Sequence, residues 1–228
     1  MNRRTFLTST ALATVGMMSG FALPSFAQET EAAEPATIVV PDLTVGDADA
    51  PIEIIEYASY TCPHCAHFHE AVFKPLKADY IDTGKVKFVY REIYFDKFGL
   101  WAAMVARCGG AMRYFGIQSL LYEQQTEWLA GGKDVMLIVE NLRKIGKTAG
   151  LSDADLDACM NNGEMAQAML AKATSEAEAD DVKATPSLVI DGVKHSNMSY
   201  SDLKRILDKK LAEIALPQSE PSEDAVEN

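Results

Sequence analysis

Two cysteines separated by two residues lie between a short β-branched segment and an amphipathic one. This arrangement restricts the local fold more than any other feature of the chain. Residues 52–58 read Ile-Glu-Ile-Ile-Glu-Tyr-Ala, which is typical of a buried strand. After the cysteines, apolar residues recur at helical spacing: Phe68, Val72, Phe73 and Leu76. The Cys62-Pro63-His64-Cys65 sequence is therefore predicted to lie at a strand-to-helix turn, with Cys62 at the N-terminus of the helix.

The start of a helix is a place where a cysteine thiolate is favoured. Unpaired N–H groups and the positive end of the helix dipole stabilise negative charge there, and Pro63 costs no hydrogen bond in the first turn. His64 is placed to donate a hydrogen bond, or to bring a positive charge, near the Cys62 sulfur. Each effect lowers the pKa of the Cys62 thiol. Cys62 then becomes a good leaving group, and its disulfide with Cys65 becomes a strong oxidant.

Two other interpretations of this segment are a metal site and a permanent disulfide. Cys62, Cys65, His67 and His69 offer four ligands. On a helix, however, Cys65 and His69 share a face while His67 points elsewhere, so the four do not converge on a tetrahedral ion. We then expect both histidines to be polar positions on an amphipathic helix. A permanent disulfide between cysteines this close closes a short loop and stabilises the fold little. We therefore expect a redox-active pair and no metal.

The first 27 residues have the three parts of a secretory signal peptide. Arg3 and Arg4 form a basic region, an apolar run follows, and Ser25-Phe26-Ala27 places small residues before an expected cut. A membrane anchor is the alternative, but the apolar run is short and is interrupted by glycine and serine. We expect residues 1–27 to be removed and the protein to reach the periplasm by the Sec or the twin-arginine route.

The composition of the remaining chain is typical of an exported globular protein. Removal of residues 1–27 leaves 201 of the 228 residues, and the loss of two arginines changes the net charge from −12 to −14. An acidic surface without a basic patch argues against nucleic acid and anionic lipid as partners. Residues 28–36 and 216–228 are polar or acidic and contain proline, so we expect both segments to be disordered.

The other two cysteines are expected to pair with each other. Export places all four in an oxidising compartment, and pairing Cys62 with Cys65 leaves Cys108 and Cys159. Both lie on predicted helical faces among apolar residues. A bridge between them would close a loop of about 50 residues and stabilise the fold by roughly 4 kcal/mol. We expect a structural disulfide; a second redox pair that tunes the first is the alternative.

Hydrophobic periodicity predicts a βαβ segment, about eighty helical residues and a final ββα segment. Strands are expected at five places: 37–45, 52–58, 86–90, 187–190 and 193–195. A helical pattern runs from 98 to about 179, and a last amphipathic helix covers 203–214. The two β-containing parts are each too small to bury a core alone. We therefore expect one sheet domain made of 37–97 and 182–215, with residues 98–181 as an inserted helical domain.

The Thr185-Pro186 pair comes directly before the predicted strand at 187–190. A proline that enters a strand often lies at a sheet edge or after a cis peptide bond. Its missing N–H leaves neighbouring backbone free to pair with an extended peptide. On the simplest interpretation, Pro186 only starts the strand.

These motifs together resemble the DsbA-type thiol:disulfide interchange proteins. The resemblance rests on Glu-Tyr-Ala-Ser-Tyr-Thr at 56–61, Cys-Pro-His-Cys at 62–65 and, after a helical segment, Ala-Thr-Pro-Ser at 184–187. It runs from about residue 36 to 214, and the Cys-Pro-His-Cys sequence is close to specific for this family among thioredoxin-like proteins. The resemblance implies an α/β, thioredoxin-like fold with an inserted all-helical domain.

The resemblance also implies a role for each residue of the catalytic motif. Cys62 is implied to be the exposed nucleophile, Cys65 its buried partner, and His64 the residue that tunes oxidising power, with Pro63 before it in the turn. Glu56 falls where the family often has a buried acid near the cysteine pair. Burial raises the pKa of a carboxyl group, which suits proton transfer to or from Cys65. A purely structural role for Glu56 is equally open.

Two further features are implied on the substrate side and in the helical domain. Pro186 is implied to be a cis-proline facing the disulfide, and Thr185 before it to contact the substrate backbone. Many family members have valine where Thr185 stands, and a hydroxyl there can change which partners bind. The Cys108 and Cys159 pair resembles a variant in which the helical domain carries its own disulfide.

The sequence as a whole predicts an exported dithiol oxidase. A substrate thiolate would attack Cys62 of the oxidised pair, and the second thiol of the substrate would resolve the mixed disulfide. The expected partners are reduced, unfolded exported proteins or peptides, and the resemblance implies a membrane partner that reoxidises the pair. We expect a monomer, with no cofactor and no bound nucleic acid. The alternatives are a periplasmic thiol reductase or isomerase, and a peptide-binding chaperone with incidental cysteines.

Overall fold

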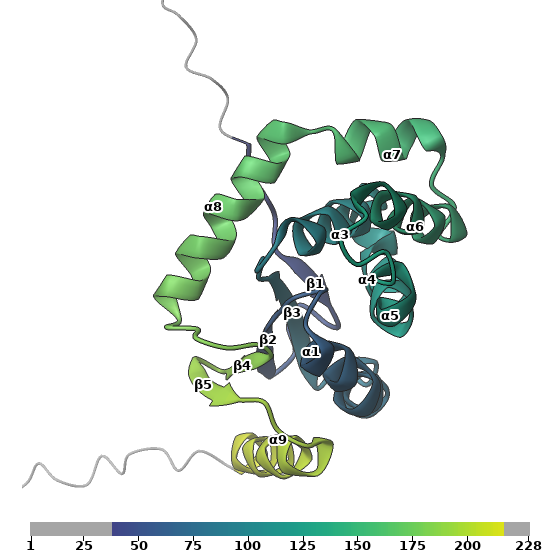
Figure 1. Ribbon diagram of the computed structural model, residues 1–228. Helices are drawn as coiled ribbons and strands as arrows, with labels where there is room; N and C mark the ends of the chain where they lie inside the picture. The colour runs from purple at the N-terminus through teal and green to yellow at the C-terminus, as the bar shows by residue number, and fades with distance from the viewer. Residues whose placement is uncertain (1–37, 217–228) are drawn as a thin grey trace, which may run out of the picture. The chain divides into compact units, whose positions relative to one another are not determined.

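The structure, a computed structural model, describes residues 38–216 (Figure 1). Three sequence predictions lie outside these residues: the signal peptide at 1–27, the disorder expected at 28–36, and the tail from 217 to 228. Within the described part of the chain, no helix is both long enough and apolar enough to cross a lipid bilayer.

The strands form one mixed sheet in the order β1-β3-β2-β4-β5. Their bounds are β1 Leu43–Val45, β2 Ile52–Ala58, β3 Val86–Glu92, β4 Ser187–Ile190 and β5 Val193–Ser196. β2 pairs in parallel with β3, whereas the pairs β1–β3, β2–β4 and β4–β5 are antiparallel. Parallel neighbours need a crossover connection, and helical residues 63–81 provide it between β2 and β3.

The strands agree with the sequence predictions except at the first one. β5 is the predicted hairpin partner of β4, and Asp191 and Gly192 between them both have positive φ, 45° and 79°, as a tight two-residue hairpin requires. The prediction of a strand over 37–45 was wrong in extent, because β1 begins only at Leu43. Pro41 has no N–H to donate to a ladder, which accounts for the late start.

The crossover after β2 is helical throughout and contains two π-helical turns. It consists of α1 Pro63–Phe68, the π-helical turn η1 His69–Phe73, α2 Lys74–Leu76 and the π-helical turn η2 Lys77–Ile81. Each π turn is wider than an α turn and shifts the residues that follow around the helix axis. The predicted apolar face is confirmed, since all four of its residues are buried: Phe68, Val72, Phe73 and Leu76.

A long helical segment connects β3 to β4, and one more helix ends the described chain. The bounds are α3 Lys97–Cys108, α4 Gly110–Glu123, α5 Gln125–Trp128, α6 Val135–Thr148, α7 Asp153–Met160, α8 Gly163–Ala179 and, after β5, α9 Tyr200–Ala215. Side chains of Asp96, Asp134 and Ser152 accept hydrogen bonds from the first-turn N–H groups of α3, α6 and α7. These caps fix where the helices begin.

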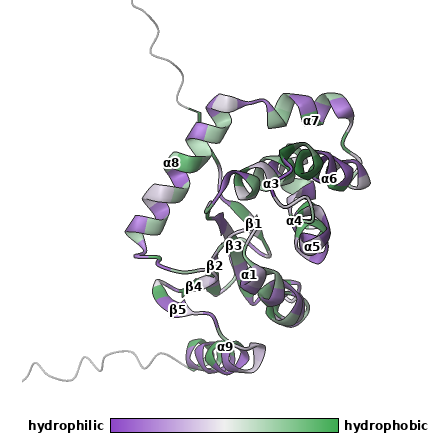
Figure 2. Cartoon of the chain, viewed as in Figure 1, coloured by the Kyte–Doolittle hydropathy of each residue, from purple (hydrophilic) through white to green (hydrophobic). Residues whose placement is uncertain are grey.

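Sheet and helical segment share one hydrophobic core. Tyr114, Ile117 and Leu121 of α4 are fully buried in the same cluster as Ile54 and Phe88 of the sheet. Figure 2 shows hydrophobic and hydrophilic residues interleaved along α9. Only one face of this helix is buried. The helical segment is therefore packed directly on the sheet that carries the cysteine motif.

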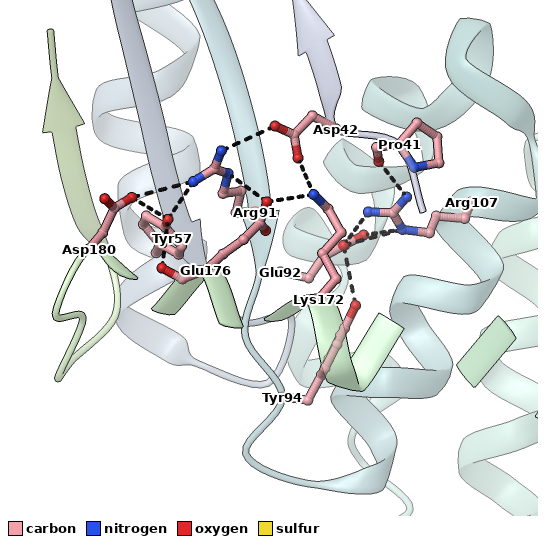
Figure 3. A network of polar contacts seen from close by, with 10 residues as sticks. All are labelled: Pro41, Asp42, Tyr57, Arg91, Glu92, Tyr94, Arg107, Lys172, Glu176 and Asp180. Atoms are coloured by element: carbon pink, nitrogen blue, oxygen red, sulfur yellow. Dashed lines mark hydrogen bonds and ion pairs between the residues drawn. The ribbon is translucent and has the colours of Figure 1, made fainter. Parts of the chain in front are cut away.

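A polar network attaches α8 to the sheet (Figure 3). The Arg91 guanidinium on β3 lies 3.2 Å from Asp42, 3.3 Å from Glu176 and 3.3 Å from Asp180, and it donates a 2.6 Å hydrogen bond to the Tyr57 hydroxyl. Glu176 and Asp180 belong to α8 and its end, whereas Tyr57 belongs to β2. Arg91 thus joins three parts of the chain that are distant in sequence.

A second arginine joins α3 to the sheet in the same region of Figure 3. The Arg107 Nε and Nη2 atoms lie 2.9 Å and 2.5 Å from the carboxylate of Glu92, whose side chain is only 4% exposed. Glu92 also accepts hydrogen bonds from the hydroxyls of Tyr94 and Tyr114. The buried charge is therefore compensated by one ion pair and two hydrogen bonds.

Candidate active site

The cysteine motif lies at the turn from β2 to α1, as predicted. Cys62 is the N-cap of α1, with extended backbone (φ −85°, ψ 118°), and its carbonyl accepts hydrogen bonds from the N–H groups of Cys65 (3.1 Å) and Ala66 (3.2 Å). Pro63 follows as the first helical residue, where its missing N–H costs nothing. The sulfur of Cys62 thus lies at the start of α1, near the backbone N–H groups of His64 and Cys65.

The two thiols differ in exposure and in acidity. Cys62 is 9% exposed and Cys65 is fully buried. The pKa of Cys62 is lowered to about 5, first by a hydrogen bond from the Cys65 thiol, then by the Thr185 side chain and the backbone N–H groups of Cys65 and His64. At neutral pH the reduced pair therefore carries its negative charge on Cys62, the less buried of the two sulfurs.

Cys65 has the opposite properties. Burial raises the pKa of its thiol far above the usual range, and the hydrogen bond to Cys62 and the charge of Glu56 raise it further. One proton is thus held on the buried sulfur while the outer sulfur carries the negative charge. Such a pair can accept or donate electrons through the outer sulfur alone.

Glu56 lies on β2, next to the cysteine pair, and is 3% exposed. Burial raises the pKa of its carboxyl to about 8, with a smaller contribution from the negative charge of Cys62. A carboxyl that is protonated at neutral pH and lies this close to Cys65 is suited to donate or accept a proton there. Proton exchange between Glu56 and Cys65 stays a prediction, as does the purely structural role.

The Thr185-Pro186 pair faces the motif from the other side. Its peptide bond is cis, and the Thr185 carbonyl oxygen lies 3.6 Å from the Cys62 sulfur. The strand that follows, β4, lies between β2 and β5, so the proline does not mark a sheet edge. Residues more than 120 positions apart in the sequence therefore form the two sides of one site.

The histidines near the motif have three different environments. The imidazole of His64 is exposed beside Cys62, and His67 is exposed as predicted. The prediction that His69 is a polar surface position was wrong, because it is 3% exposed and stacks against Phe73 (5.0 Å) and Tyr122 (5.2 Å). Burial, followed by the charge of a nearby lysine, lowers the pKa of His69 to about 4, so it is neutral. It shares the buried face of Cys65 one turn earlier, which accounts for its burial.

Sequence analysis did not identify several polar residues beneath the motif. The hydroxyl of Tyr60 donates to that of Tyr114 (2.8 Å), and the hydroxyls of Tyr90 and Tyr122 are 2.5 Å apart. Gln125 of α5 donates hydrogen bonds to the backbone of the turn itself. None of these residues belongs to a contiguous motif, so only tertiary structure brings them to the site.

A hollow of about 560 Å³ lies where α1 and η1 meet the segment after β5. It is lined by residues of α1 and η1, among them His67, Phe68 and Val72, and by residues 197–201 of the loop and helix start after β5. Its walls are partly apolar and partly polar.

Cys108 and Cys159 are joined by a disulfide away from the motif. The bond connects the end of α3 to α7, with 5.8 Å between the two Cα atoms and 51 positions between them in sequence. Both helices belong to the segment between β3 and β4. The bond therefore crosslinks that segment internally.

Comparison with known proteins identifies the family. The family model described as thioredoxin matches residues 39–209. A Rickettsia typhi protein provisionally named a protein-disulfide oxidoreductase is 33% identical over 171 residues, which are 75% of this chain and 62% of that protein. The chain thus spans less than two thirds of the length of the rickettsial relatives. Disulfide bond formation protein D of Bacillus subtilis is 24% identical over 176 residues, which are 73% of this chain and 76% of that protein.

Solved structures agree with this assignment. The crystal structure of alpha-DsbA1 from Wolbachia pipientis superposes with a TM-score of 0.70 at 26% identity, covering 78% of this chain and 97% of that one. The crystal structure of BdbD from Bacillus subtilis superposes with a TM-score of 0.66 at 21% identity and shares the fold. The superposition covers 75% of this chain and 93% of that one. The predicted thioredoxin-like fold is thereby confirmed. The chain belongs to the thioredoxin family and is a member of DsbA type, with helices α3 to α8 inserted between two strands of the sheet.

Proposed function

We propose that this protein is an exported dithiol:disulfide oxidoreductase that donates the Cys62–Cys65 disulfide to reduced proteins. The observation that carries the proposal is the asymmetry of the two thiols. The accessible sulfur of Cys62 is stabilised as a thiolate, whereas Cys65 is buried and keeps its proton. Stabilising the thiolate favours the reduced protein, which makes its disulfide oxidising.

The reaction begins with the oxidised pair. A substrate thiolate attacks the sulfur of Cys62, the Cys62–Cys65 bond breaks, and Cys65 leaves with the bonding electrons. Cys65 leaves as a thiolate, and because its pKa is raised it takes the proton of the Glu56 carboxyl, directly or through water. Glu56 then regains a proton from solvent. The substrate is now joined to Cys62 by a mixed disulfide.

The second half releases the product. A second substrate thiolate attacks the substrate sulfur of the mixed disulfide, and Cys62 leaves as its stabilised thiolate. The substrate has lost two electrons and gained a disulfide, and the protein has gained both electrons as a dithiol. A membrane redox partner, as in the sequence prediction, would take these two electrons and restore the Cys62–Cys65 bond.

The remaining site residues have supporting roles in this proposal. Pro63 and the exposed His64 shape the helix start at Cys62, while Thr185 and the cis-proline Pro186 present backbone and a hydroxyl to the substrate beside the same sulfur. The hollow next to α1 would hold the chain of the substrate on one side of its cysteine. A basic N-terminal region followed by an apolar run supports export to the periplasm.

The test is oxidation of a reduced peptide that contains two cysteines by the oxidised protein in the absence of oxygen. We expect one peptide disulfide per protein, no oxidation by a Cys62→Ala variant, and a trapped mixed disulfide with a Cys65→Ala variant that has been activated at Cys62. Peptide oxidation by Cys62→Ala would contradict the proposal. Reduction of a disulfide peptide by the dithiol protein, without the forward reaction, would favour the reductase alternative.

A further inference from the structure

Gln125 connects the helical segment to the backbone of the cysteine turn. It is the first residue of α5, is 6% exposed, and lies more than 60 positions from the turn in sequence. Its Nε2 atom donates one hydrogen bond to the carbonyl oxygen of Tyr60 (2.8 Å) and a second to that of Cys62 (3.0 Å). A single buried amide thus holds the carbonyl groups on either side of Thr61.

The carbonyl of Cys62 is also where α1 begins. It accepts the N–H groups of Cys65 and Ala66, and the N–H of Cys62 itself donates to the Ser59 carbonyl (3.1 Å). A shift of this carbonyl would therefore turn the first peptide groups of the helix. Those groups include the N–H of Cys65, which faces the Cys62 sulfur.

We propose that Gln125 is a positioning residue, which clamps residues 60–62 so that the helix start keeps its N–H groups directed at the Cys62 sulfur. The side chain suits this task because an amide nitrogen has two N–H groups for two carbonyl acceptors. The orientation of the amide follows from its surroundings, since the Oε1 atom cannot accept from a carbonyl. The clamp makes the helical segment part of the redox site without contributing a reacting atom.

The other groups around the Cys62 sulfur come from the sheet side and from α1. Glu56 faces it from β2, Cys65 and the exposed His64 from α1, and the Thr185 side chain from the turn before β4. Gln125 acts from the helical segment and only through the backbone. This inference deepens the proposed function, because it rests on Cys62 being the reacting sulfur.

The test replaces the amide by a side chain of similar size that cannot donate. Gln125→Met removes both hydrogen bonds and adds no charge. Gln118→Met is the matched control, because Gln118 lies on the neighbouring helix α4, is 1% exposed, and has an Oε1 atom with no hydrogen-bond partner among the described residues. Both variants replace one buried glutamine of the helical segment, but only the first loses contacts to the cysteine turn.

The readout is the pH profile of iodoacetamide alkylation of the reduced pair. Cys62 alone is expected to react, since Cys65 is buried and the other two cysteines are bonded to each other. The midpoint of this profile is expected at about pH 5 in the parent. We expect Gln125→Met to raise the midpoint by roughly half to one pH unit. The alkylation rate at pH 5 would then fall roughly two- to fivefold. Gln118→Met should keep the parental midpoint even if its melting temperature falls.

A midpoint of Gln125→Met equal to that of the parent would overturn the inference, and so would an equal shift in both variants. If Gln125→Met does not fold, Gln125→Asn replaces it. This variant keeps the amide, but its side chain is one methylene shorter and no longer reaches the two carbonyl groups. The same shift of the midpoint is expected. Alkylation needs neither substrate nor redox partner. An unchanged midpoint therefore counts against the clamp alone, whereas peptide oxidation by Cys62→Ala counts against the proposed function alone.

Discussion

Cys62 and Cys65 are chemically identical residues within one helical turn, and their surroundings give them opposite acidities. The N–H groups at the helix start act on Cys62, whereas Cys65 is removed from solvent on the buried face. In a mixed disulfide at Cys62, the buried thiol holds its proton and is a poor nucleophile. We therefore expect the bound substrate to be released by its own second thiol rather than by Cys65, in keeping with the proposed disulfide donation.

The Thr185 hydroxyl is predicted to help set the acidity of Cys62. A hydrogen bond from this side chain lowers the pKa of Cys62. Thr185→Val keeps the shape but removes the donor, so we expect the pKa to rise by roughly half to one pH unit. Thr185→Ser keeps a hydroxyl and should stay near the parental value. Alkylation rates of Cys62 measured against pH would give the midpoint for each protein. Equal midpoints for Thr185→Val and the parent would contradict the prediction.

Glu56 is predicted to make the stability of the reduced protein depend on pH. Its carboxyl has a pKa of about 8 in the folded protein against an ordinary value of 4.5, so the folded protein keeps a proton that the unfolded chain releases. The stability that this retained proton gives the folded state is complete below pH 4.5 and is lost as the pH rises towards 8. Glu56→Gln cannot ionise and should gain stability relative to the parent across that window, by at most about 1.4 kcal/mol per pH unit.

Urea unfolding of the reduced parent and of Glu56→Gln at pH 5 and pH 8 would measure this gain. Comparing the two proteins cancels the opposite pH dependence contributed by Cys62. Glu53→Gln is the control, because Glu53 lies on the same strand with its carboxylate at the surface beside Lys87. A stability difference that is the same at both pH values would show that Glu56 is ionised in the folded protein.

At the scale of residues, sequence analysis located the parts of the candidate site that stand in contiguous motifs. Cys62, Cys65 and the Thr185-Pro186 pair were found because each stands in a short recognisable sequence. Gln125 was not found, since its partners are backbone atoms of a distant turn and any glutamine in a helix looks the same in sequence. His69 was misplaced because polarity was weighed above the face that it shares with Cys65.

Among the elements, the disulfide between α3 and α7 is predicted to be structural. It closes a loop of 51 positions, and opening it should lower the free energy of unfolding by about 4 kcal/mol. The double variant Cys108→Ala, Cys159→Ala should therefore melt well below the parent while Cys62 keeps its alkylation midpoint. Adding a reductant to the variant, in which only Cys62 and Cys65 remain, controls for effects of that pair. An unchanged melting temperature, or a shifted Cys62 midpoint, would favour the regulatory alternative.

The attachment of α8 to the sheet is predicted to depend on Arg91. The side chain is 19% exposed. Its loss would leave Asp180 without a cationic partner among the described residues, and Glu176 and Asp42 with Lys172 alone. We expect Arg91→Met to destabilise the protein by about 2 kcal/mol and to speed amide hydrogen exchange in α8 selectively. Arg143→Met is the matched control, because Arg143 also bridges two carboxylates, but these are 62% and 64% exposed, and it should cost less than about 1 kcal/mol. Equal losses in both variants would contradict the prediction.

Periodicity predicted the long elements well and the irregular ones poorly. The strands β2 and β4 and the helix α9 carry strong alternating or helical patterns, and all three are present close to the predicted bounds. The π turns η1 and η2 were not predicted, because they depend on how the helix packs between the sheet and its neighbours. The short β1 was predicted too long because Pro41 cannot donate to the ladder, and the strand starts only after it.

For the whole molecule, the site exists only because three distant parts of the chain meet. The cysteine turn follows β2, the cis-proline turn precedes β4, and α5 reaches the turn from the helical segment between them. Sequence order predicted that the two β-containing parts combine into one sheet. It did not predict how the helical segment contacts the turn, since that contact depends on tertiary packing and has no periodic pattern.

The reduction potential of the Cys62–Cys65 pair tests the central claim most directly. The chain from residue 28 to 228 would be equilibrated with glutathione buffers, and alkylation mapping would follow Cys108 and Cys159 in the same samples. The account predicts a Cys62–Cys65 potential above about −200 mV, more oxidising than the glutathione pool, with the other disulfide still closed. A potential near that of thioredoxin, about −270 mV, would contradict disulfide donation and assign the pair to a reductase.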